Sequence, residues 1–146
     1  NTYIGCGQSV SVHSYETLEH TADSLVRCTG NTLEECFANA AYALFDQTVD
    51  LRGVKPAENI SLRTEGEDPE SMLYNFLSEL LFIEETENLF LCEFKVRFEE
   101  NTVVCDAKGE RLDLSRHRTR TEVKAVTYHM MEVDPETPSV TVLFDI

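Results

Sequence analysis

The chain has little glycine, and its six glycines are scattered. They form neither a G-x-x-x-x-G-K loop nor a G-x-G-x-x-G turn, which excludes the two common phosphate-binding cradles. A G-x-S-x-G elbow, which carries the nucleophile of many hydrolases, is also missing. Four histidines (His13, His20, His117 and His129) lack the spacing of metal ligands, and their spacing to Cys28 supports no nucleophile pair.

Long apolar runs and cysteine motifs are missing as well. No run approaches the roughly 18 apolar residues of a membrane span, so no membrane segment is expected. The five cysteines are an odd number without a C-x-x-C, which indicates neither a disulfide framework nor a zinc site. Cys28, Cys36 and Cys105 fall in apolar patterns and should pack as small hydrophobes. We therefore expect a reducing location, the cytoplasm, or the nucleus in a eukaryote.

Basic residues are few. Twelve Lys and Arg stand against 27 Asp and Glu, giving a formal net charge of -15. Such a chain is poorly suited to bind nucleic acid tightly by itself, because it repels phosphates. A basic protein partner or a cation fits this charge better, although solubility alone would also account for it.

The apolar pattern predicts one domain of the α+β class. We expect a single-domain sandwich, with a largely antiparallel sheet of six or seven strands and two amphipathic helices packed on one face. Residues 1–14 are interpreted as a loose N-terminal arm, and residues 15–146 as the folded domain. The predicted helices run from the N-cap Thr32 to near Gln47 and from Asp68-Pro69 to about Glu85. The predicted strands are 16–18, 25–28, 60–65, 90–98, 101–108, 121–133 and 139–145.

The last predicted strand places two anionic groups one residue apart. Asp145 carries a side-chain carboxylate, and Ile146 would add a main-chain carboxylate as the last residue given. Burying such charge is costly unless it is paired, and hard cations such as calcium and magnesium prefer carboxylate oxygens. The candidate third ligand lies in the distant segment Glu19-His-Thr-Ala-Asp23. A frayed and solvated end is the alternative interpretation.

The segment Thr121-Glu-Val-Lys-Ala-Val-Thr-Tyr-His129 has an unusual polar load for a strand. As a strand it would place Lys124 on one face with Val126 and Tyr128. Lys124 could then neutralise a partly buried carboxylate cluster, or it could point outward to solvent.

Taken together, these segments resemble the archease family. The resemblance rests on Tyr15-x-x-Leu-Glu-His-Thr-Ala-Asp23, Thr32-Leu-Glu-Glu-Cys-Phe, Arg116-His117, Thr121 to His129 and the terminal Phe-Asp-Ile146, and it covers nearly the whole chain. It implies a non-enzymatic protein cofactor of the tRNA-splicing RNA ligase, which joins ends through a guanylylated histidine. The cofactor would promote transfer of GMP to the ligase and allow repeated turnover.

The resemblance also implies a metal site at Asp23, Asp145 and Ile146, with calcium as the ion. Magnesium or manganese would suit the same oxygen ligands. Glu19, His20 and Lys124 are expected to form an activation surface beside this site. Ser24, Thr29 and Met130-Met131 depart from the family pattern, next to the motifs rather than at the proposed ligands.

Two further functions stay open. One is a metal-dependent phosphoester hydrolase, in which the carboxylates would activate water with Glu19 or His20 as the general base. The other is a general chaperone or interaction module for RNA-modifying enzymes.

Overall fold

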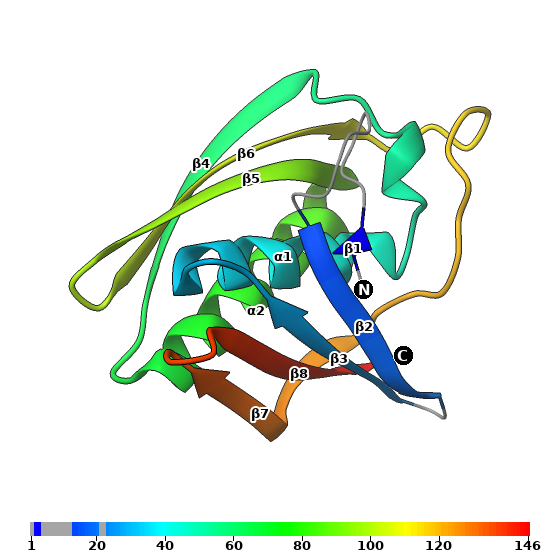
Figure 1. Ribbon diagram of the computed structural model, residues 1–146. Coiled ribbons are helices and arrows are strands. Elements are labelled where there is room, and N and C mark those ends of the chain that lie inside the picture. The colour runs from blue at the N-terminus through cyan, green and yellow to red at the C-terminus, as the bar shows by residue number, and fades with distance from the viewer. Residues whose placement is uncertain (1, 4–12, 21–22) are drawn as a thin grey trace.

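The computed structural model describes residues 2–3, 13–20 and 23–146, and for residues 2, 3, 13 and 17–20 it describes the backbone alone. Eight strands and two α-helices follow one another along this part of the chain (Figure 1). The strands are β1 (Thr2–Tyr3), β2 (His13–His20), β3 (Asp23–Thr29), β4 (Glu58–Glu65), β5 (Leu89–Glu99), β6 (Thr102–Arg111), β7 (Ala125–Asp134) and β8 (Ser139–Asp145). The helices are α1 (Leu33–Asp46) and α2 (Pro69–Glu87), with a short 3-10 turn η1 (Leu51–Gly53) between α1 and β4.

The predicted α+β class and the antiparallel pairing are confirmed, but the strands do not form one sheet. They divide into a five-stranded sheet of order β1-β2-β3-β8-β7 and a three-stranded sheet of order β4-β6-β5. The helices lie between these two sheets instead of on one face of a single sheet (Figure 1).

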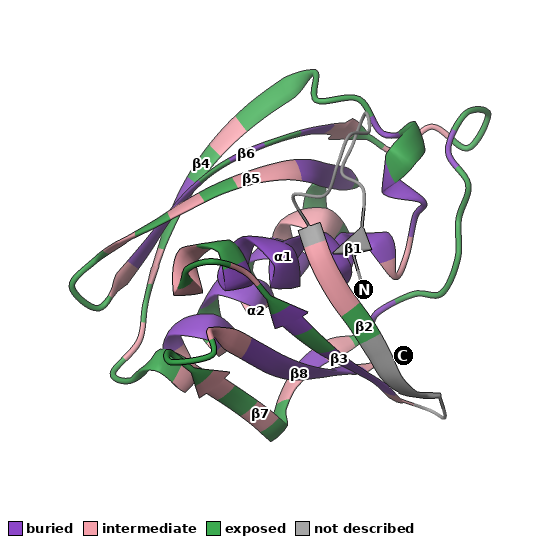
Figure 2. Cartoon of the chain, viewed as in Figure 1, coloured by how far each residue is buried: buried purple, intermediate pink, exposed green. Residues whose placement is uncertain are grey.

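The burial of α1 explains this arrangement. The sequence predicts one apolar stripe on this helix, yet every residue from Cys36 to Asp46 is buried. A helix that is buried all round needs cover on both sides, because no face is left for water. One sheet cannot provide that cover, so β5 packs on one side of α1 and β3 on the other (Figure 2).

The ends of both helices follow from local sequence. The Thr32 side chain accepts a hydrogen bond from the Glu35 N–H at 3.2 Å, which confirms the predicted N-cap. Asp68 caps α2 by accepting from the Ser71 N–H at 2.7 Å, with Pro69 in the first turn. Asn88 ends α2 in the left-handed conformation, three residues beyond the predicted end near Glu85.

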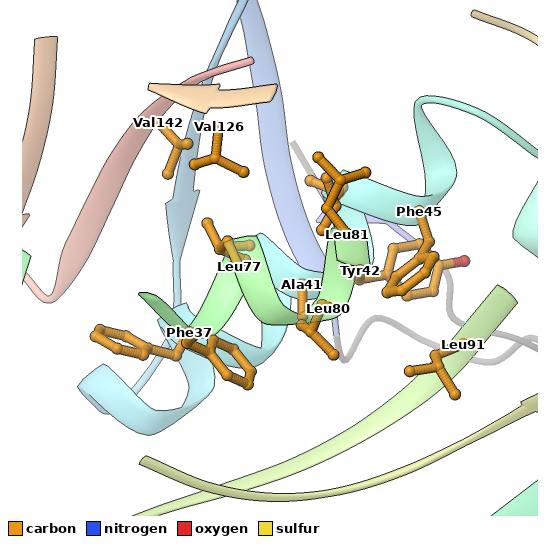
Figure 3. Packing of buried hydrophobic residues seen from close by; sticks show 14 of the residues in the cluster. Phe37, Ala41, Tyr42, Phe45, Leu77, Leu80, Leu81, Leu91, Val126 and Val142 are labelled. Atoms are coloured by element: carbon orange, nitrogen blue, oxygen red, sulfur yellow. The ribbon is translucent and has the colours of Figure 1, made fainter. Parts of the chain in front are cut away.

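The core is one cluster between the two sheets. Side chains of α1, α2, β5 and the five-stranded sheet point toward one another there (Figure 3). Phe37 stacks with Phe76 at a centroid distance of 6.1 Å and meets Phe98 edge-on at 4.9 Å. Cys28, Cys36 and Cys105 are buried free thiols, as predicted, and Cys92 is a fourth.

Two predicted boundaries need correction. The strand predicted over residues 121–133 begins only at Ala125, and Thr121 pairs with Gln47, directly after α1, instead of with a strand. In the predicted loose arm, Thr2 and Tyr3 pair with Ser14 and His13, while the rest of residues 1–12 lies outside the described residues. Within the described part of the chain, neither helix is long and apolar enough to cross a membrane.

Candidate metal-binding and activation site

The candidate site lies where three strands of the five-stranded sheet end together. Asp23, at the start of β3, is the direct partner of Asp145, at the end of β8. Asp145 is at the same time the partner of Ala125, the first residue of β7. Directly opposite residues of an antiparallel pair project to the same face, so both carboxylates lie on one face of the sheet.

This face is the one turned away from the core. The alternate residues Val26 and Val142 are fully buried in the core cluster, whereas Asp23 and Asp145 are half-buried. Side chains directly opposite have Cβ atoms about 4.5–5.5 Å apart, and like charges in that position destabilise a ladder. A cation between the two carboxylates would convert this repulsion into attraction.

The structure therefore brings together two of the three predicted ligands, which are more than 120 residues apart in sequence. The third, Ile146, directly follows Asp145 and is half-buried. The described residues contain no group of three or more His, Cys, Asp or Glu side chains placed to hold a metal. Asp23 and Asp145 are only two such side chains.

The predicted activation surface reaches the same place through its backbone. The Lys124 N–H donates to the Asp145 main-chain oxygen at 2.7 Å, and the Lys124 side chain is exposed. The sequence had placed Lys124 on one strand face with Val126 and Tyr128. In the structure β7 begins only at Ala125, so Lys124 lies just before the strand. Glu19 and His20 pair with Leu25 and Ser24 at the other border of β3, and their side chains lie outside the described part.

Sequence reasoning missed an ion pair between the buried Asp46 and the partly exposed Arg120. Asp46, the last residue of α1, is fully buried. Its carboxylate accepts hydrogen bonds from the Tyr15 hydroxyl at 2.6 Å, the Leu51 N–H at 3.1 Å and Arg120 Nη1 at 3.1 Å. The only signal in the sequence is an acidic residue directly after the apolar run Leu44-Phe45, and no partner could be assigned to it.

A second cluster contains His117, whose side chain is fully buried. The Asp113 N–H donates to His117 Nδ1 at 2.8 Å, so Nε2 carries the proton and donates to Glu110 Oε2, also at 2.8 Å. Burial opposes ionisation of Glu110, but hydrogen bonds from Arg116, the Lys55 N–H and His117 outweigh it and lower the pKa of Glu110 to about 2. Both ring nitrogens are thus used to hold the 110–117 segment.

Cys28 is equally unsuited to nucleophilic chemistry. It is fully buried on the core side of β3, and burial raises the pKa of its thiol far above the usual range. Since the thiolate is the reactive form, Cys28 is an inert core residue.

Comparison with known proteins gives a consistent result. The model of the archease protein family (MTH1598/TM1083) matches residues 15–146. Protein archease of Pyrococcus furiosus is 42% identical over 127 residues, which cover 84% of this chain and 89% of that protein. Protein archease of the fish Ictalurus punctatus is 39% identical over 140 residues, covering 90% of this chain and 85% of that protein.

Two solved structures share the fold. The solution structure of protein 1598 of Methanobacterium thermoautotrophicum has a TM-score of 0.78 at 36% identity, covering 90% of this chain and 98% of that one. The crystal structure of a Thermotoga maritima protein, described as an archease and possible chaperone, has a TM-score of 0.61 at 23% identity, covering 92% and 98%. The second likeness concerns the fold alone.

Proposed function

The chain belongs to the archease family, and on that premise we propose that it is a non-enzymatic cofactor of the tRNA-splicing RNA ligase that works through a guanylylated histidine. It promotes guanylylation of the ligase and allows multiple turnover in tRNA splicing. The observation that supports this most is the pairing of Asp23 with Asp145 at one edge of the fold, where residues from both ends of the family motif meet. The protein acts where its ligase does, in the cytoplasm or the nucleus.

We propose further that Asp23, Asp145 and the Ile146 main-chain carboxylate bind one hard cation. Calcium is the first choice, and magnesium or manganese would use the same oxygen donors. The donor chemistry fits, because two carboxylates stand directly opposite each other on the face of the sheet turned away from the core. The bound ion would neutralise these charges and hold the ends of β3 and β8 together.

Glu19, His20 and Lys124 are the proposed activation surface. Their backbones border the carboxylate pair on its two sides, β2 on one and the segment before β7 on the other. The ligase would contact this edge. The net charge of -15 suits a basic RNA enzyme, and electrostatic steering makes the rate of encounter fall as salt rises.

The test is incorporation of GMP from GTP into the cognate ligase, at substoichiometric and equimolar ratios of this protein. We expect faster guanylylation and more turnovers with the wild-type chain, and no stimulation with Asp23→Ala. Glu67→Gln is the matched control, because it removes an acidic charge from an exposed loop position far from this edge in sequence. Equal rates with and without the folded wild-type protein, at every ratio, would refute the proposal.

The same preparations separate the alternatives. A chaperone role, which the description of the Thermotoga maritima neighbour suggests, predicts that ligase recovery after heating improves without any change in guanylylation. A metal-dependent hydrolase predicts turnover of phosphoesters by this protein and calcium, magnesium or manganese alone.

A further inference from the structure

Residues 118–124, here called the strap, connect the 110–117 segment, which His117 and Glu110 hold, to the start of β7. The strap runs alongside the end of α1 before it reaches the end of β8 (Figure 1). Its backbone pairs with residues 47–50 through three hydrogen bonds: the Asp50 N–H to the Arg118 oxygen, the Arg120 N–H to the Thr48 oxygen and the Thr121 N–H to the Gln47 oxygen, at 2.7–3.0 Å. The strap is thus a short irregular strand laid against the chain that leaves α1.

Two side chains attach this strap to the interior: Val123, which is buried in the core cluster, and Arg120. Arg120 Nη1 donates to the main-chain oxygen of Asp46 at 2.9 Å and to its Oδ2 at 3.1 Å. Arg120 Nη2 lies 3.5 Å from Asp50 Oδ2. Asp46 is fully buried, whereas the Arg120 side chain is 36% exposed, so loss of the guanidinium would leave a buried carboxylate with one partner fewer.

The other end of the strap enters the candidate site. Four residues after Arg120, the Lys124 N–H donates to the Asp145 main-chain oxygen, and the next residue, Ala125, is the ladder partner of Asp145. The position of the Asp145 backbone is therefore set from two sides, by β3 and by the strap. The direction in which the Asp145 carboxylate points depends on that backbone.

We propose that Arg120 and Asp46 are positioning residues of the site, and that their ion pair holds the strap so that Lys124 and Asp145 keep their relative placement. The pair touches neither the ion nor the ligase. It acts through the strap, as outer residues of metal sites orient the direct ligands. This inference rests on the proposed function for its purpose, but the mechanical claim stands on the protein alone.

The decisive variant is Arg120→Lys, which keeps the positive charge near Asp46 but cannot make the paired contacts of the guanidinium. Amide hydrogen exchange at Lys124, measured by NMR on the metal-free protein, should become roughly 10-fold faster, and the calcium affinity measured by calorimetry should fall roughly 10-fold. Arg52→Lys is the matched control, because Arg52 also contacts Asp50 but lies outside the strap. Tyr15→Phe removes another hydrogen bond of the same Asp46 carboxylate without touching the strap.

Both controls should leave the Lys124 exchange rate and the calcium affinity as in the wild type. If Arg120→Lys behaves like Arg52→Lys in exchange at Lys124, the proposal is wrong, whatever the ligase assay shows. If the wild type binds no calcium, the proposed metal site fails, while faster exchange at Lys124 in Arg120→Lys still supports the positioning role. Arg120→Gln, which removes the charge, should increase exchange at Lys124 further, and exchange at Lys124 is compared in both variants with that at buried amides of β6 to separate local release from global unfolding.

Discussion

The charged pairs of the three-stranded sheet differ in sign from the pair at the end of the five-stranded sheet. On the outer face of the three-stranded sheet, opposite charges face each other: Lys95 is the partner of Asp106, and Glu93 the partner of Lys108. Glu99 also forms ion pairs with Arg63 and Arg97, with an Nη2-to-carboxylate-oxygen distance of 3.0 Å in each. At the end of the five-stranded sheet, Asp23 faces Asp145, like against like.

This difference separates facing charges of opposite sign from facing charges of the same sign. Exposed ion pairs contribute little stability, and on the outer face of the three-stranded sheet the facing charges are balanced. Facing carboxylates repel each other, and the cation proposed above would offset that repulsion. Like charges also lie close together at the end of α2. There, burial together with Glu85 and Glu122 raises the pKa of Glu84 to about 7.

The largest expected effect comes from adding the proposed cation to the protein. Calcium at 100 times its dissociation constant should stabilise the wild type by about 2.7 kcal/mol. Asp23→Asn should be more stable than the wild type without metal, by about 0.2–1 kcal/mol, because one of two facing charges is gone. With calcium the order should invert, since the variant lacks a ligand. Thermal unfolding with EDTA and with calcium measures both, and an order that stays the same in both buffers would contradict the proposed site.

A backbone change in the other sheet should destabilise without affecting the site. Gly109 of β6 sits against β5, where an added Cβ would lie 2.6 Å from Leu91 Cα and still closer to the Phe90 oxygen. We expect Gly109→Ala to lower the free energy of unfolding in urea by about 2 kcal/mol, as overpacking commonly does. Gly53→Ala is the matched control, because its added Cβ meets nothing nearer than the Arg116 oxygen at 3.9 Å. The calcium affinity of folded Gly109→Ala should equal that of the wild type.

The contributions of Glu84 and Glu110 to stability should change with pH in opposite directions. The pKa of Glu84 is raised in the folded protein, so the folded state binds more protons than the unfolded state between about pH 4.5 and 7. Metal-free wild type should therefore lose stability across that range relative to Glu84→Gln, by roughly 1–2 kcal/mol once screening of this half-buried group is allowed for. The pKa of Glu110 is lowered to about 2, so its contribution is present above about pH 4.5 and disappears as the pH falls toward 2. Urea unfolding of both Gln variants from pH 3 to 7.5 checks the signs, and parallel curves would refute them.

The smallest expected effect concerns a buried hydroxyl. Ser24 follows Asp23, faces the core and is 3% exposed, and its Oγ has no hydrogen-bond partner among the described residues. Ser24→Ala should stabilise the protein by about 1 kcal/mol, because an unsatisfied buried polar group is removed. Ser61→Ala in the three-stranded sheet is the contrast, since the Ser61 hydroxyl donates to Asp106 at 2.6 Å and its loss should be neutral or slightly destabilising. A melting temperature of Ser24→Ala at or below that of the wild type would disagree with this.

The local elements were predictable because their signals are local. The caps at Thr32 and Asp68 depend on residues a few positions apart. The division into two sheets was not predictable from the apolar stripes. It follows from the burial of α1 on all sides, and periodicity alone does not reveal what covers a helix.

For the site, the sequence by itself determined the residue types: carboxylates at Asp23 and Asp145 in segments that resemble one family, and a net charge of -15 that disfavours nucleic acid as a partner. Tertiary structure decided that these two carboxylates face each other, that Lys124 meets Asp145 through its backbone, and that Asp46 holds Arg120. The physical reason is that the residue type alone gives the charge. Repulsion, burial and pairing depend on which distant residue the fold places opposite that charge.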